Sequence, residues 1–97
     1  MKSVHDLWAR AFPDDVQRRI VEVALEQAAV RGVHELRTRQ SGPTRFVDLH
    51  LELSGQMTLA EAHRVSDRVE AAIRAAVPGA DVMIHQDPDD DSRPDRP

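Results

Sequence analysis

Apolar side chains recur at every second position through residues 45–53, near the middle of the chain. Alternate side chains of an extended backbone point to opposite faces, so this spacing predicts a strand with one apolar face. The apolar face carries Val47, Leu49, Leu51 and Leu53, and the other face carries Phe46, Asp48, His50 and Glu52. Such a strand requires a sheet around it and a second layer over the apolar face. A chain of 97 residues supplies one such core, and therefore one small domain.

Two segments with helical spacing of apolar residues can supply that second layer. The first begins at Pro13, continues with apolar residues at helical spacing to Val30, and is ended by Gly32. The second begins with a capping box at residues 58–61 and ends at Pro78. Both helices are amphipathic, so each has an apolar stripe to bury.

Two shorter strands complete the expected sheet. They are predicted at residues 33–39 and 81–86, and the turn residues 41–43 join the first of them to the middle strand. The order helix, strand, strand, helix, strand predicts an α+β open sandwich, a three-stranded sheet with both helices over one face.

Five side chains on four of these elements are able to bind a divalent metal ion. His85 and Asp87 are two residues apart on one strand and therefore share a face, and His50 lies on the non-core face of the middle strand. His34 opens the first strand and His63 lies on the second helix. Imidazole and carboxylate are the protein ligands for zinc-like ions where thiolates are absent, and this chain has no cysteine. Spacing alone does not decide whether the five side chains meet.

Composition excludes several classes of function. A net charge of -4 and an aromatic content of 3% argue against nucleic-acid binding. No apolar run reaches the ~18 residues of a membrane span, and residues 1–12 do not form a signal peptide. No serine lies in a nucleophile-like context and no glycine-rich loop precedes a helix, so we expect no enzyme. We expect a cytoplasmic protein with a disordered acidic tail at residues 89–97.

Three segments resemble the cytoplasmic C-terminal domain of cation diffusion facilitator transporters. They are GVHELRTRQSGPTRFVDLHLEL at residues 32–53, the helix EAHRVSDRVEAAI and the closing VPGADVMIHQDP. The resemblance covers about residues 13–88, and residues 1–12 resemble the linker that follows the last membrane helix of these transporters. It implies a metallochaperone-like (ferredoxin-like) fold and a V-shaped homodimer beneath a membrane domain that exports zinc, iron or related ions.

The resemblance also assigns roles to the five metal-binding candidates. His34, His50, His63, His85 and Asp87 match the positions that form a binuclear site near the dimer interface in zinc-type members. The implied ligand is Zn²⁺, with other divalent transition metals such as Fe²⁺ or Mn²⁺ as options. Gln86 matches an auxiliary contact of that site. Metal bound there is expected to draw the two arms of the dimer together and to tune transport.

The membrane half of the family is absent from this sequence, so we expect no ion transport and no direct membrane insertion by this chain. Either the chain is a domain cut from a transporter, at the inner face of the cell membrane, or it is a free-standing cytoplasmic protein; the second reading is slightly favoured. Three roles follow: a metal-responsive dimer, a metal-independent interaction module that pairs with a full-length transporter, and a soluble metal carrier or buffer.

Overall fold

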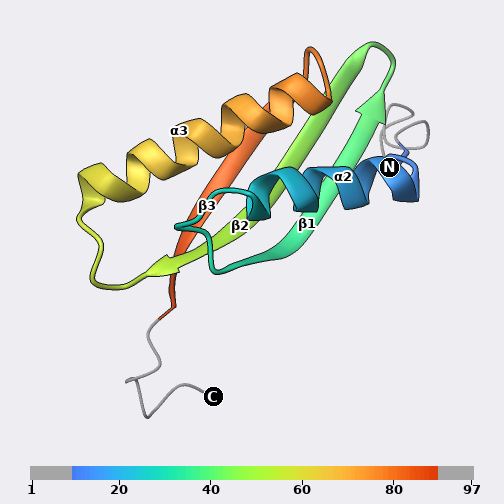
Figure 1. Cartoon of the computed structure of the whole chain (residues 1–97). Helices are drawn as coiled ribbons and strands as arrows, with labels where there is room; N and C mark the ends of the chain where they lie inside the picture. The colour runs from blue at the N-terminus through green and yellow to red at the C-terminus, as the bar shows by residue number, and fades with distance from the viewer. Residues whose placement is uncertain (1–9, 90–97) are drawn as a thin grey trace, which may run out of the picture.

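Residues 10–89 are described by the computed structural model, which contains two helices over a three-stranded sheet (Figure 1). In chain order the elements are α2 (Asp14–Leu25), β1 (Gly32–Ser41), β2 (Thr44–Ser54), α3 (Leu59–Ala76) and β3 (Asp81–Asp89). The predicted α+β class and element order are therefore confirmed. In the described part of the chain, neither helix combines the length and apolar character needed to cross a membrane.

The sheet is mixed, with strand order β1-β2-β3. β1 and β2 are antiparallel and are joined by a two-residue loop, because Ser41 pairs directly with Thr44. Gly42 opens this loop with a φ of 59°, as type II′ hairpins require at their first central position. β3 runs parallel to β2, and a parallel neighbour requires a crossover, which α3 provides.

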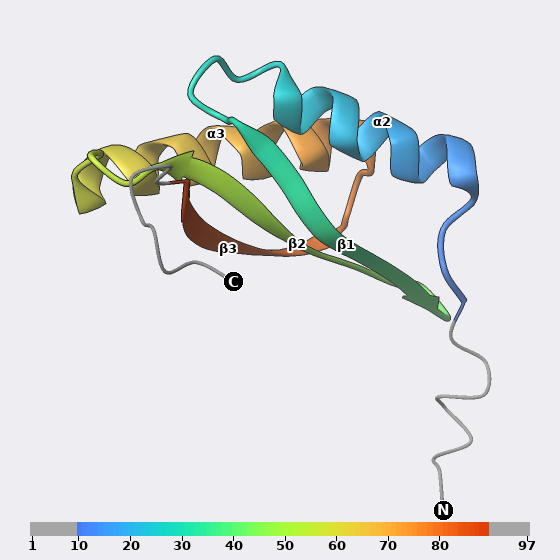
Figure 2. The ribbon, with the colours of Figure 1, turned by 90° about the horizontal axis from the view of Figure 1, so that it is seen from below.

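Both helices cover one face of the sheet and leave the other open (Figure 2). The core lies between the layers, and its fully buried side chains include Ile20, Val47, Leu49, Leu51, Val69 and Ile73. In β2 the burial alternates from Phe46 to Ser54, as its sequence pattern predicts. Every second side chain of β2 therefore projects from the open face, which is where functional side chains can gather.

A β-bulge interrupts β1 between His34 and Arg37. His34 pairs with His50 and Arg37 pairs with Asp48, so two residues of β1 lie opposite one residue of β2. Glu35, inside the bulge, has a φ of 52°, which is uncommon for a residue other than glycine. Because of the extra residue, His34 and Arg37 both lie on the open face of the sheet.

The first helix is shorter than predicted, because it ends at Leu25 instead of continuing to Val30. After Leu25 the chain forms turns, in which the N–H of Val30 donates to the carbonyl of Gln27 at 3.0 Å. Val30 is still buried, so it satisfies the apolar spacing without being helical. The cause is tertiary: the N–H of Arg31 donates to the carbonyl of Glu52 at 2.8 Å, which draws the chain into the sheet.

The flanking strands are longer than predicted. β1 begins at Gly32, the residue expected to end the helix, and β3 continues to Asp89. Pro88 is tolerated in β3 because this strand lies at the edge of the sheet. Asp89, expected to begin the disordered tail, pairs with Ser54. The rest of that tail, residues 90–97, and positions 1–9 of the predicted linker lie outside the described residues.

Candidate metal centre

Three of the predicted ligands form a row across the open face of the sheet, which we call the histidine row: His34, His50 and His85. His34 pairs with His50 across β1 and β2, and His50 pairs with His85 across β2 and β3. Residues paired in this way project to the same side of a sheet, about 5 Å apart. The strand register therefore brings together imidazoles that are far apart in the sequence.

His50 and His85 of the histidine row are stacked on each other, and each contacts a carboxylate. The rings of His50 and His85 are stacked, with centroids 4.4 Å apart and planes 17° from parallel. Nδ1 of His50 lies 2.9 Å from Oδ2 of Asp87, and Nε2 of His85 lies 3.0 Å from Oδ1 of Asp48. The stacked pair thus lies between two carboxylates, one from β2 and one from β3.

Three of these groups converge closely enough to share one ion. The ligand atoms of Asp48, His50 and His85 all lie within 4.8 Å of one another. A hollow of about 220 Å³ lies beside them, lined also by Glu35 and Arg37. Two imidazoles and one carboxylate are a donor set that zinc and its first-row neighbours accept. The residues present therefore fit a divalent transition metal.

Of the other predicted ligands, Asp87 contacts the trio through His50, whereas His34 and His63 have other partners within one chain. Nε2 of His34, at the end of the histidine row, lies 3.0 Å from Oε1 of Glu52. His63 is exposed on α3, where its Nε2 lies 3.5 Å from Oδ2 of Asp67 one helical turn later. Because α3 covers the opposite face of the sheet, the fold of a single chain does not bring His63 to the histidine row.

The side chain of Gln86 points away from the open face. Its Nε2 donates to Oγ of Ser66 at 2.6 Å and to the carbonyl of Ala62 at 3.4 Å. Both partners belong to α3, so this amide holds β3 against the helix. The neighbours of Gln86 in the sequence, His85 and Asp87, point to the other side.

Three further carboxylates contact the histidine row, from Glu35, Asp48 and Glu52, and none of them was predicted as a ligand. Asp48 and Glu52 flank His50 at two residues on either side, so strand periodicity already places them on its face. Oε2 of Glu35 lies 4.0 Å from Nε2 of His50, and it reaches that position from the bulge of β1. No spacing rule could predict the last contact, because the bulge is not visible in the sequence pattern.

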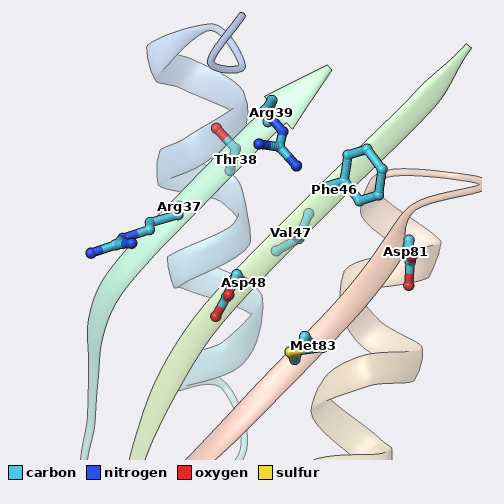
Figure 3. A pocket seen from close by; sticks show the side chains of 8 residues that line it. All are labelled: Arg37, Thr38, Arg39, Phe46, Val47, Asp48, Asp81 and Met83. Carbon is cyan, nitrogen blue, oxygen red and sulfur yellow. The ribbon is translucent and has the colours of Figure 1, made fainter. Parts of the chain in front are cut away.

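A larger hollow of about 400 Å³ adjoins the trio on the same face (Figure 3). The guanidinium of Arg39 lies 5.1 Å from the ring centroid of Phe46, and Met83 nearby is 59% exposed. Asp48 is shared between this hollow and the smaller one. The open face therefore has a polar half around the histidines and a more apolar half toward the β1–β2 hairpin.

Comparison with known sequences gives consistent matches. The family model described as "Cation efflux protein, cytoplasmic domain" matches residues 12–89. Cation-efflux pump FieF of Pectobacterium atrosepticum is 52% identical over 86 residues, which are 89% of this chain and 29% of that protein. FieF of Escherichia coli O1:K1 / APEC is 48% identical over 87 residues, 90% of this chain and 29% of that protein. The chain thus spans about three tenths of the length of these relatives.

Solved structures with the same fold include CzrB and the C-terminal domain of MamM. One CzrB structure has a TM-score of 0.75 and 34% identity, covering 81% of this chain and 99% of that one. A zinc form of CzrB has a TM-score of 0.73 and 33% identity, covering 88% and 96%. A MamM C-terminal domain has a TM-score of 0.73 and 28% identity, covering 78% and 98%.

Proposed function

This chain belongs to the family of cation efflux protein cytoplasmic domains, and on that premise we propose that it is a dimeric regulatory domain that binds divalent metal. In this proposal the metal closes the dimer and modulates efflux by a transporter at the inner face of the cell membrane. The observation that supports it best is the convergence of His50, His85 and nearby carboxylates on the open face. The proposed ligands are His34, His50, His63, His85 and Asp87.

Zinc is the metal that the donor chemistry favours. Neutral imidazole with carboxylate and no thiolate suits Zn²⁺, although the same donors accept other first-row ions such as Fe²⁺ and Mn²⁺. The zinc form of CzrB is a structural relative that carries this metal. Selection among the ions in the cell then depends on their availability as well as on the ligands.

The position of His63 explains why the proposal requires two chains. His63 is on α3, across the sheet from the histidine row, so the five ligands can share one site only if His63 comes from a second copy. A homodimer with the open face turned toward the partner's helix meets that requirement. The bound ion would then join groups from both arms of a V-shaped dimer.

Charge on the open face provides the driving force for closure. Four carboxylates surround the histidine row, and without a cation their mutual repulsion opposes drawing them closer together; they are Glu35, Asp48, Glu52 and Asp87. A bound divalent ion supplies the compensating positive charge. The closed arrangement offers the ion more ligands than the open one, so binding shifts the population toward the closed dimer.

Calorimetric titration with Zn²⁺ tests the proposal on the wild-type chain, His50→Ala and His85→Ala. We expect both variants to bind zinc at least about tenfold more weakly, since changes even outside the first ligand layer commonly cost that much. Small-angle scattering with and without zinc would show a more compact dimer in the wild type. Unchanged zinc binding in both variants would refute the proposal.

A metal-independent interaction module is the second candidate, and one observation favours it. Four histidines each contact a carboxylate of the same chain, so their imidazoles have partners without a metal; they are His34, His50, His63 and His85. Such a domain could pair with a full-length transporter through its open face. The same dimer dimensions with and without zinc would favour this function. A third candidate, a metal carrier or buffer, requires measurable transfer of bound zinc to an acceptor.

A further inference from the structure

A hollow of about 290 Å³ lies on the helix side of the sheet, at the end where the β1–β2 hairpin turns. Its lining comes from four parts of the fold: the segment before α2, α2 itself, the two hairpin strands and the end of α3. The lining residues are Phe12, Pro13, Val16, Gln40, Arg45 and Ala76. The histidine row lies on the opposite face of the sheet, so the two features are separate.

Part of the lining is apolar and firmly held. Phe12 is 5% exposed, and Val16 and Ala76 are packed against the core. These three side chains belong to different elements, and the backbone N–H of Phe12 donates to Oγ1 of Thr38 at 3.0 Å. The apolar surface of the hollow is therefore built by the fold of the domain.

The rest of the lining supplies a cation and a hydrogen-bond acceptor. The guanidinium of Arg45 donates one long bond, of 3.4 Å, to the carbonyl of Pro78, and no carboxylate within residues 10–89 pairs with it. The amide nitrogen of Gln40 donates to the carbonyl of Gly42 at 3.4 Å, so its amide oxygen can accept another bond. An indole suits this combination, because tryptophan is the best cation–π partner and its N–H usually finds an acceptor when buried.

The chain itself passes beside this hollow just before α2. Arg10 pairs with Gln40 through two backbone hydrogen bonds, of 3.0 and 2.7 Å. Trp8, the only tryptophan of the chain, precedes Arg10 by two residues, and two residues span at most about 7 Å. Paired residues of neighbouring strands point to the same side, as do residues two apart on one strand. An extended course back from Arg10 would therefore direct Trp8 to the side of Gln40 and the hollow.

We propose that this hollow is the docking site of Trp8, which anchors residues 1–9 on the domain. The indole packs on Val16 and Ala76, lies against the guanidinium of Arg45 and donates its N–H to the amide oxygen of Gln40. None of these residues belongs to the proposed metal site, so the inference does not depend on metal binding. Docking fixes the direction from which the chain reaches the sheet, and it joins a movement of that segment to both helices.

Intrinsic fluorescence of the full chain tests the proposal, because Trp8 is its only tryptophan and tyrosine is absent. In the wild type we expect emission at a shorter wavelength than in the urea-unfolded chain, and several-fold weaker quenching by acrylamide. Val16→Glu places a carboxylate in the hollow and should move both values toward those of the unfolded chain. Glutamate at the third position of α2 suits the positive end of the helix dipole, so circular dichroism should show the helices retained.

Val21→Glu is the matched control. It introduces the same side chain at another partly buried valine of α2, where Val21 lines a different hollow with Arg18 and Leu36. Emission and quenching of this variant should equal those of the wild type. Proton NMR adds the location: the indole protons should show nuclear Overhauser contacts to the methyl groups of Val16 and Ala76 in the wild type.

Three results would overturn the inference. The first is a wild-type Trp8 that acrylamide quenches as strongly as in the unfolded chain. The second is a Val16→Glu variant that changes emission and quenching no more than Val21→Glu does. The third is protection of Trp8 that disappears on dilution together with a dimer, because the indole would then be buried against a second copy. Zinc binding is unaffected by any of these outcomes, so the proposed function is tested separately.

Discussion

Replacing Gln86 by alanine should loosen the attachment of β3 to α3. The Gln86 amide donates to Oγ of Ser66 at 2.6 Å and to the carbonyl of Ala62 at 3.4 Å. The first bond is short and its acceptor, Ser66, is only 8% exposed, whereas the second bond is long and weak. A net loss of about 1 kcal/mol in the free energy of unfolding is therefore expected. In a domain of this size, that loss lowers the midpoint of thermal unfolding by about 4–8 °C.

A double-mutant cycle isolates this bond. Ser66→Ala alone removes the same bond but also favours the helix by a few tenths of a kcal/mol, and the cycle cancels that gain. Urea unfolding followed by circular dichroism, on wild type, both single variants and the double variant, should give a coupling of about 0.5–1.5 kcal/mol. Gln40→Ala combined with Ser66→Ala is the control, because the Gln40 amide bonds to Gly42 in the hairpin. A Gln86–Ser66 coupling below about 0.3 kcal/mol, within the scatter of independent sites, would refute this reasoning.

Three further substitutions test the core, the hairpin and the helix cap. Leu49→Ala, at a side chain that is 0% exposed, should cost about 2–5 kcal/mol in urea unfolding, and a loss under about 1 kcal/mol would contradict the packing described. Gly42→Ala has free space around the new methyl group, so only the positive φ should cost stability, about 1–2 kcal/mol by thermal unfolding. Thr58→Ala should cost about 1 kcal/mol, because the hydroxyl accepts from the N–H of Glu61. The Thr58 backbone N–H, followed by its side chain, lowers the pKa of Glu61, so an NMR titration of this variant should show that pKa rising partway toward its ordinary value. Because the pKa is lowered in the folded state, the associated stability is present above the unfolded pKa and is lost as pH falls through the folded one, a dependence that Glu61→Gln should remove.

Local patterns predicted most of the fold. The alternation of β2 and the capping box of α3 are local signals, and the structure confirms both, with Thr58 as the N-cap. The predicted end of the first helix was wrong, because Val30 fits helical spacing and is buried although it is not helical. What ends the helix is the bond from Arg31 to the carbonyl of Glu52, about twenty residues later in the sequence. A contact of that kind carries no local signal.

In the candidate metal site too, local patterns were predicted correctly and contacts between strands were not. Strand periodicity correctly placed His85 and Asp87 on one face, and it placed His50 on the open side of β2. Periodicity within one strand could not show which residue faces which across strands, and that register brings Asp48 to His85. Whether His63 joins these groups depends on a second chain, which a pattern in one sequence does not describe.

The bulge in β1 has a consequence for insertions and deletions. On the hairpin side of the bulge, odd-numbered residues such as Arg37 and Arg39 face the open side, whereas before it the even-numbered His34 does. The extra residue in the bulge therefore changes whether even-numbered or odd-numbered side chains of β1 face the open side. Deleting one of the two bulge residues would leave one residue of β1 opposite Leu49, so the hairpin register and the pairing of His34 with His50 would both be unchanged. A one-residue deletion at this position therefore removes the bulge and leaves His34 on the open face, whereas the same deletion between Arg37 and the hairpin would turn His34 to the helix side if the bulge is kept.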